Sequence, residues 1–147
     1  MANNRLSDLL QILVYVEIHK DEACSSQRIA SSLNSNASLV RQMLSQLSKA
    51  GIISLTRGKS GVSINKNLDD LTVLDVYKAI DNQGDLLKID MNTSKSCNVG
   101  VAFPEVLQEH YHELQRQVEK QMSTISLQEL VDETKESIET HSERMIL

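Results

Sequence analysis

Apolar and polar residues alternate in the first third of the chain with the period of amphipathic helices. Apolar side chains recur every three or four positions over residues 5–19, and again in two shorter stretches that follow. Ser25 or Ser26 is suited to cap the first short helix and Asn36 the second, because their side-chain oxygens accept N–H groups at helix starts. Gly51 ends the second short helix, since glycine readily adopts the left-handed conformation found there. Two short helices joined by a tight polar turn predict a helix-turn-helix.

Beyond residue 51 the pattern changes to the two-residue period of β-strands. Ile52, Ile53 and Leu55 are strand formers, and Val62 and Ile64 alternate with polar residues. The basic, glycine-containing turn between these two runs predicts a β-hairpin with a charged tip. The sequence therefore predicts a mostly α-helical protein with a small β-hairpin wing, which is a winged helix-turn-helix.

The second half of the chain predicts further helices. Thr72 is placed to cap one of them, with Asp75 at its third position. Residues 82–100 are less regular. Pro104 is expected to begin a long helix, because the first helical position needs no backbone donor. Ser126 is expected to cap a short final helix.

The long helix carries a narrow apolar stripe with mostly polar neighbours. Spacings of three and four residues in such a stripe are typical of a coiled-coil seam rather than of the broad face of a core helix. We therefore expect the helix to join two copies of the chain into a homodimer. The stripe consists of Leu107, Tyr111, Leu114, Val118 and Met122. The expected division is a winged helix-turn-helix DNA-binding domain at residues 1–82, and a sensor loop with dimerisation helices, of which the long helix is one, at residues 83–147.

The charge is distributed unevenly along the chain. The net charge of −5 is unusual for a nucleic-acid-binding protein. However, residues 1–66 hold eight basic and four acidic side chains, whereas the remainder holds seven basic and sixteen acidic ones. A positive part joined to a negative part indicates a polyanion-binding surface attached to a solvated arm. Ordinary surface charge that happens to be uneven is the alternative.

The composition argues against several classes of protein. The chain has 147 residues, of which 40% are hydrophobic and 3% aromatic. No apolar run approaches the about 20 residues of a membrane-spanning helix. Two distant cysteines do not make a disulfide framework, so a reducing cytoplasm is the expected location. We find no phosphate-binding loop, nucleophile elbow or zincin motif. The four histidines do not form a convincing metal site. An enzyme is therefore not expected.

The second helix of the helix-turn-helix is the expected recognition helix, which enters the major groove of DNA with its N-terminus first. Arg41 suits guanine, Gln42 suits adenine, and Ser38 is permissive. Arg57 and Lys59 at the hairpin tip are placed to reach the minor groove or phosphates. The predicted DNA-binding residues are Arg5, Ser26, Gln27, Asn36, Ser38, Arg41, Gln42, Arg57 and Lys59. Solvated helix and turn residues are the alternative interpretation.

Six stretches taken together resemble one family of regulators. They are Arg5–Ser7, Ser25–Ala30, Asn36–Gln42, Leu47–Ile53, Arg57–Lys59 and Leu71–Ile80. This combination resembles the Rrf2 family of winged-helix regulators, which includes iron–sulfur, nitric-oxide, cysteine-metabolism and thiol-stress repressors. The resemblance covers residues 5–81 and, more loosely, the long helix. It implies dimers joined by that helix, palindromic double-stranded DNA operators, and DNA contacts by the recognition helix and the wing.

Two features depart from the family's pattern. Ser60 and Val62 stand in a part of the wing where the family usually carries glycines. Cluster-binding members carry three closely spaced cysteines before the long helix, whereas this chain has only Cys97 there. An iron–sulfur cluster normally needs about four protein ligands, mostly thiolates. The chain therefore resembles the cluster-free branch, and we expect neither an iron–sulfur cluster nor another cofactor.

Cys97 is the candidate for redox sensing. It lies in a polar loop beside Lys95 and before a helix, and such surroundings favour the thiolate. The resemblance implies that some cluster-free relatives sense oxidants through a cysteine at this place. Cys24 of the other subunit is a candidate disulfide partner. An inert thiol at position 97 and a packing role for Cys24 are the alternatives.

These observations lead to one hypothesis and its competitors. We expect a sequence-specific DNA-binding transcriptional regulator that represses its targets as a homodimer and responds to oxidation of a single cysteine. One alternative is a winged-helix dimer that acts as a protein-interaction module. Another is a regulator that responds to a small ligand without redox sensing. A third is a different winged-helix dimer family that binds aromatic ligands, in which N- and C-terminal helices jointly form the dimer.

Overall fold

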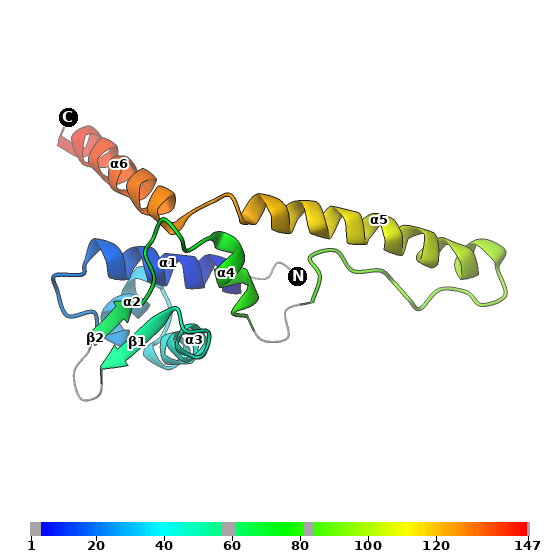
Figure 1. Cartoon of the computed structure of the whole chain (residues 1–147), viewed down its shortest axis with the longest axis horizontal. Coiled ribbons are helices and arrows are strands. Elements are labelled where there is room, and N and C mark those ends of the chain that lie inside the picture. The colour runs from blue at the N-terminus through cyan, green and yellow to red at the C-terminus, as the bar shows by residue number, and fades with distance from the viewer. Residues whose placement is uncertain (1–3, 57–60, 81–83, 147) are drawn as a thin grey trace.

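The computed structural model describes residues 4–56, 61–80 and 84–146 (Figure 1). Ile53 pairs with Ile64 and Thr56 with Gly61 in an antiparallel hairpin. The chain is therefore mostly helical with a small β-hairpin, as the sequence predicts. The elements in chain order are α1 (Arg5–Ile18), α2 (Ser26–Leu33), α3 (Ala37–Lys49), β1 (Ile53–Thr56), β2 (Gly61–Ile64), α4 (Val73–Lys78), α5 (Asn98–Met122) and α6 (Leu127–Ile146).

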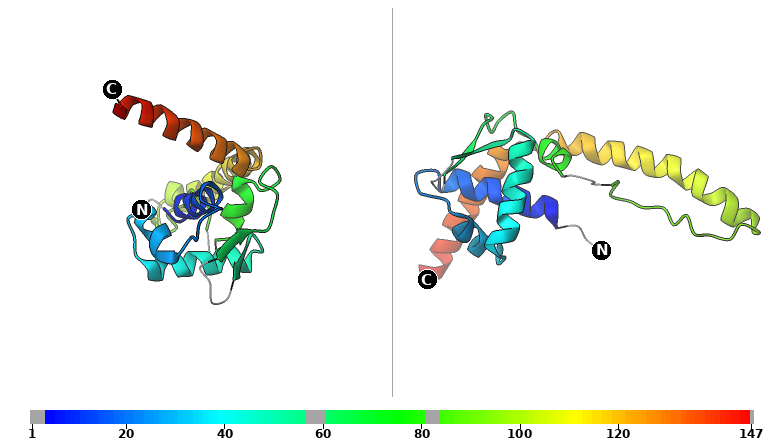
Figure 2. Two further views of the ribbon diagram at one scale, coloured as in Figure 1. Left: turned by 90° about the vertical axis from the view of Figure 1, so that its left-hand side faces the viewer. Right: turned by 90° about the horizontal axis from the view of Figure 1, so that it is seen from below.

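The core of the protein lies among α1, α2, α3, the hairpin and α4. Apolar residues of α1 occupy its centre, and Leu9, Ile12 and Leu13 have no solvent exposure. Ile29 of α2 and Val40 of α3 are buried in the same cluster. Viewed from two further directions, α1 lies between α3 and α6 (Figure 2). The stripe of apolar residues that predicts α1 is thus the stripe around which the other helices pack.

The predicted helix caps are confirmed. The Ser25 side chain accepts the Arg28 N–H at 3.2 Å, and Thr72 forms a reciprocal capping box with Asp75. After α3, Gly51 has a φ of +77°, a left-handed conformation that favours glycine. These local bonds satisfy backbone donors that helix ends leave unpaired, and they set where each helix begins and ends.

The C-terminal helix returns to this core after the long α5. The Leu127 N–H donates to the Leu71 carbonyl at 2.8 Å, and the Val73 N–H donates to the Ile125 carbonyl at 2.9 Å. Leu127 and Val131 are buried with α1 in the core cluster. We call residues 4–80 and 125–146 together the head, and residues 84–124 the arm. The arm projects away from the head (Figure 1).

The prediction that Pro104 begins the long helix is wrong, because α5 begins at Asn98 and contains the proline. Proline lacks the N–H that would donate to the carbonyl of Gly100, one turn earlier. The Thr93 hydroxyl donates to that carbonyl instead, at 2.6 Å. A Cβ atom on Gly100 would lie 2.5 Å from the Ser94 carbonyl oxygen. The glycine thus lets the preceding segment approach closely enough to supply the missing donor.

The final helix is capped as predicted but is longer than predicted. The Ser126 side chain accepts the Glu129 N–H at 3.1 Å. α6 then runs for 20 residues rather than ending near Ile138. Over the described parts of the chain, no helix combines the length and apolar character needed to cross a membrane.

Candidate nucleic-acid interface

α3 turns one polar face to solvent and one apolar face to the core. Val40, Met43, Leu44 and Leu47 are buried. Ser38, Arg41 and Gln42, which the sequence predicts to contact DNA bases, are all exposed on the side of α3 opposite these residues. Residues three and four positions apart lie on the same side of a helix, so the three side chains form a continuous polar face near the N-terminus of α3. We call it the α3 face.

The turn before α3 holds that helix at a defined angle to α2. Asn34 has a φ of +51°, in the left-handed region. The Asn36 side chain accepts the Leu39 N–H at 2.9 Å. The Asn36 side-chain oxygen is therefore occupied as the cap of α3. On α2, Gln27 is exposed and Ser26 is half-buried at the start of the helix.

Arg5 connects α1 to the recognition helix. Its guanidinium Nη1 donates to Gln46 Oε1 on α3 at 3.4 Å, and the Arg5 side chain is partly exposed. Gln46 follows Gln42 by one helical turn. Arg5 thus lies beside the α3 face although more than forty residues separate the two in sequence.

The structure describes the two strands of the wing but not the residues between them. β1 ends at Thr56 and β2 begins at Gly61. The predicted contact residues Arg57 and Lys59 lie outside the described residues. The strands of the hairpin pack beside α3 and α1, so the described part of the wing lies against the helices of the head.

Two further residues extend the α3 face beyond the set that the sequence predicts. Ser45 and Lys49 are exposed, and they lie one and two turns after Arg41 and Gln42. The regular three-and-four spacing from Arg41 was the signal that could have identified them. Lys49 adds a positive charge at the C-terminal end of the face.

The predicted dimer stripe follows α5. Leu114 and Val118 are exposed in the single chain, whereas Leu107, Tyr111 and Met122 are half-buried. The arm carries further exposed apolar side chains beside them, including Phe103 and Val106. An extended helix with this many exposed apolar residues is unusual for an isolated surface.

Cys97 immediately precedes α5 as its N-cap residue, and its thiol is exposed. The backbone N–H groups of Gly100 and Val99 lower the pKa of this thiol below its ordinary value. The Cys97 side chain forms no capping hydrogen bond with the start of α5. A partial positive charge at the N-terminus of a helix favours an anion, and it is the chemical basis for thiolate character here.

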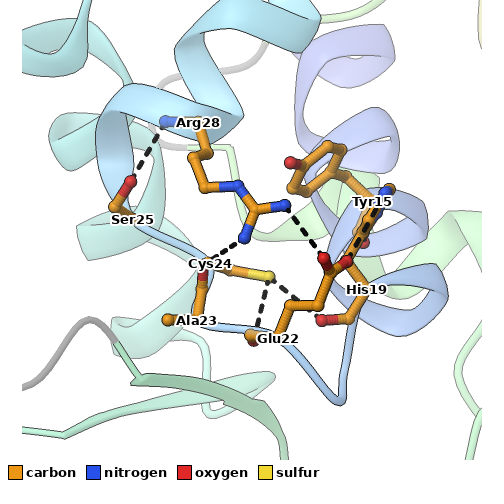
Figure 3. A network of polar contacts seen from close by, with 7 residues as sticks. All are labelled: Tyr15, His19, Glu22, Ala23, Cys24, Ser25 and Arg28. Carbon is orange, nitrogen blue, oxygen red and sulfur yellow. Dashed lines mark hydrogen bonds and ion pairs between the residues drawn. The ribbon is translucent and has the colours of Figure 1, made fainter.

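Cys24 has the opposite environment, in the loop between α1 and α2 (Figure 3). The thiol is 5% exposed and belongs to the core cluster. It lies 3.5 Å from the His19 carbonyl oxygen, to which it donates weakly. Burial raises the pKa of Cys24, the Arg28 charge opposes this, and the Glu22 charge adds to it. Cys24 therefore has the character of a packing residue.

Arg28 holds the same loop together. Its Nη1 donates to the Ala23 carbonyl at 2.7 Å, and its Nη2 lies 3.5 Å from Glu22 Oε1 (Figure 3). The His19 ring stacks on Tyr15, with ring centroids 4.2 Å apart. The two Arg28 contacts tie its exposed guanidinium to the loop between α1 and α2.

The described residues do not fit a metal site. Across residues 4–56, 61–80 and 84–146, no three His, Cys, Asp or Glu side chains gather where they could hold a metal ion. Cys97 precedes α5 in the arm, whereas Cys24 lies in the loop between α1 and α2 of the head (Figure 3). The two thiols of one chain are therefore not placed to ligate a cluster together.

Comparison with known proteins gives consistent results. Residues 2–133 match the Rrf2 family model, which is described as an iron-dependent transcriptional regulator. The chain is 34% identical over 132 residues to YwnA of Bacillus subtilis (strain 168), which is named provisionally as an HTH-type transcriptional regulator. That match covers 90% of this chain and 98% of YwnA.

Solved structures share the fold. The global cysteine regulator CymR of B. subtilis superposes with a TM-score of 0.65 at 16% identity, covering 90% of this chain and 96% of CymR. IscR of T. potens superposes with a TM-score of 0.68 at 18% identity, covering 93% of this chain and 90% of IscR. At these identities the likeness concerns the fold alone.

Proposed function

The chain belongs to the Rrf2 family of transcriptional regulators, and from this premise we propose that it is a sequence-specific repressor that binds a palindromic operator as a homodimer in the cytoplasm. Members of this family regulate transcription and are not enzymes. The α3 face is the observation that carries the proposal. It combines an exposed Arg and an exposed Gln, both able to make two hydrogen bonds to one base, near the N-terminus of a well-packed helix.

The surroundings of the α3 face suit DNA binding. The free N–H groups at the N-terminus of α3 and of α2 attract phosphate, and Gln27 is exposed there. Arg5 adds a guanidinium from α1. We assign Arg41 and Gln42 to base reading, Ser38 and Gln27 to backbone contacts, and Arg57 and Lys59 to the wing contact.

Gln42→Ala tests this assignment. The variant loses about 1–3 kcal/mol of affinity for the preferred operator, the value of one good base contact, and keeps its affinity for random DNA. Gln121→Ala, which changes an exposed Gln on the arm, is the matched control and binds as wild type. Equal losses on both DNAs would reject base reading. Binding that does not weaken as salt increases would favour a protein-interaction module instead, because phosphate contacts impose a steep salt dependence.

We assign the input signal to oxidation of Cys97. An oxidant such as hypochlorite takes two electrons from the exposed thiolate and leaves a sulfenic acid, which condenses with a second thiol to a disulfide and releases water. The added group lies at the start of α5, at the end of that helix far from the head (Figure 1), so in the proposed dimer it acts through the long helix on the spacing of the two half-sites. Cys24 remains a packing residue in this proposal.

An operator-binding assay before and after mild oxidation tests the thiol switch. Wild type changes its affinity on oxidation and recovers with dithiothreitol, whereas Cys97→Ser does not respond. Cys24→Ser serves as the control and responds as wild type does. If Cys97→Ser responds to the oxidant as wild type does, the switch does not depend on this thiol.

A groove between α1 and α6 favours a small ligand as the second candidate for the input signal. Its volume is about 810 Å³, within the range of small-molecule sites. Polar groups such as Gln11 and His19 also line it. The apolar lining consists of Leu6, Leu10, Val14, Tyr15, Ile18, Leu130 and Ile138. An apolar naphthalenesulfonate dye is a direct probe. Dye fluorescence that is equal for wild type and Val14→Trp would argue against a ligand in this groove.

A further inference from the structure

Gln115 is the only amide or charged side chain that is almost fully buried in the described part of the chain, with 8% exposure. It lies on α5, where neighbouring polar residues such as Gln117 are exposed. A buried carboxamide is costly unless its donors and acceptor are all used. Burial of Gln115 is therefore tolerated only if other groups of the protein satisfy its carboxamide.

The Gln115 carboxamide joins three separate parts of the chain. Its Nε2 donates to the Tyr77 hydroxyl oxygen of α4 at 3.0 Å and to Glu119 Oε2, one turn later on α5, at 3.3 Å. Its Oε1 accepts the Leu86 backbone N–H at 3.0 Å. The Tyr77 hydroxyl in turn donates to the Gly84 carbonyl at 3.4 Å.

These partners lie where the arm meets the head. Tyr77 belongs to α4, which is anchored in the head by Val73 and Val76. Gly84 and Leu86 belong to the segment that leads from the head to Cys97. The bonds span 38 and 29 residues along the sequence, so they tie together elements that the chain itself does not hold close.

An apolar side chain of the same length would fill the space between α5 and α4 without fixing the angle between the two helices. Hydrogen bonds act over a narrow range of distance and angle, and a fully satisfied buried network makes its surroundings rigid. The carboxamide therefore restricts the angle between α5 and α4, whereas apolar contacts alone would let α5 slide and tilt.

That angle matters because of the length of the arm. α5 has 25 residues, which corresponds to about 37 Å at 1.5 Å per residue. Gln115 lies 17 residues, or about 25 Å, from the far end of α5. A tilt of about ten degrees at Gln115 moves that end by about 4 Å, slightly more than one base step of DNA. In a dimer joined through α5, the same tilt would change the distance between the two recognition helices.

We propose that Gln115 is a positioning residue that sets the angle between head and arm, and thereby the spacing of operator half-sites that the dimer accepts. The proposal rests on the proposed function, since half-site spacing has meaning only for a DNA-binding dimer. Gln115 touches no DNA, and it acts through Tyr77 and through the segment before Cys97.

The test compares Gln115→Met with Gln117→Met. Methionine keeps the length of the side chain but removes its hydrogen bonds. Gln117 is exposed, and its described bond is to Glu113 of the same helix at 2.9 Å, so Gln117→Met is the matched control. Each protein is titrated with a series of operators whose half-sites are moved together or apart by one and two base pairs. Hydrogen exchange of the Leu86 amide is measured on the same samples without DNA.

Gln115→Met is expected to fold and dimerise, to lose about tenfold of its discrimination between operator spacings, and to exchange the Leu86 amide about tenfold faster. Gln117→Met behaves as wild type in both measurements. Tyr77→Phe removes the hydroxyl from the opposite side and loses the same discrimination, which keeps the test valid if Gln115→Met does not fold.

Two results distinguish a failure of the proposed DNA-binding function from a failure of the proposed role of Gln115. If wild type shows no preferred operator, the proposed function fails, and Leu86 exchange still reports whether Gln115 holds the segment. If wild type discriminates spacings and both Gln115→Met and Tyr77→Phe do so equally well, Gln115 does not position the head, and the inference is overturned.

Discussion

The head and the arm of this protein use apolar residues in opposite ways. In the head, Leu9, Ile12 and Leu127 are completely buried within the single chain. In the arm, Phe103 is 53% exposed and Leu114 is 48% exposed. The head thus completes its own core, whereas the arm carries an apolar surface that its own chain leaves in solvent.

This difference indicates that the head is stabilised by folding of a single chain, whereas the arm is stabilised by association of two chains. Burial of apolar surface stabilises the head by about 25 cal/mol per Å² within one chain, at any protein concentration. The arm can gain the same stabilisation only by association, which depends on concentration. Substitutions in the two regions should therefore have effects that different measurements detect.

The largest effect is expected from Leu114→Asp in the arm. In the proposed dimer a symmetric seam brings the two substituted carboxylates together in an apolar interface, and an unpaired buried charge costs about 3–5 kcal/mol. Sedimentation should show a monomer. The head should remain folded, and an operator titration should show weak binding. Gln117→Asp, on the same helix, is the control and remains a dimer. A dimer formed by Leu114→Asp with wild-type affinity would disprove the seam.

A smaller effect, on a different measurement, is expected from Leu127→Ala. The variant removes a completely buried side chain where α6 meets the head, and such substitutions cost about 2–5 kcal/mol. The free energy of unfolding should fall by this amount at all protein concentrations. Ile138→Ala removes an exposed side chain from the same helix and should change stability little. Unfolding of Leu127→Ala at the wild-type denaturant concentration would show that α6 is not part of the head.

The smallest effect on stability is expected from alkylation of Cys97. The two thiols should nevertheless differ sharply in reactivity, because one lies in the arm and the other in the head. The pKa of Cys97 is lowered and that of Cys24 is raised, so the thiolate of Cys97 forms at the lower pH. Alkylation of Cys97 by iodoacetamide should begin at a pH below that of free cysteine, while Cys24 stays unmodified until the head unfolds. Mass spectrometry of each cysteine across a pH series measures this. Faster alkylation of Cys24 than of Cys97 would contradict both environments.

Local chemistry explains why much of the head could be predicted from the sequence. Ser25, Asn36 and Thr72 cap helices as expected, because a cap depends on residues only three positions away. The exposed side of α3 could be predicted for the same reason. The predictions that go wrong involve contacts from further along the chain. Pro104 lies inside α5 because Thr93 supplies the missing donor, and nothing in the local pattern around the proline indicates this.

The sequence alone determined the amphipathic faces, the caps, the hairpin and the family, since each depends on residue type and short-range order. The tertiary structure decided that α6 returns to pack on α1 and that Gln115 faces the junction of head and arm. It also decided which cysteine is buried. These features arise from pairing between residues tens of positions apart. Such pairings compete with many alternatives of similar hydrophobicity, and only the packed chain, with its buried polar groups satisfied, selects among them.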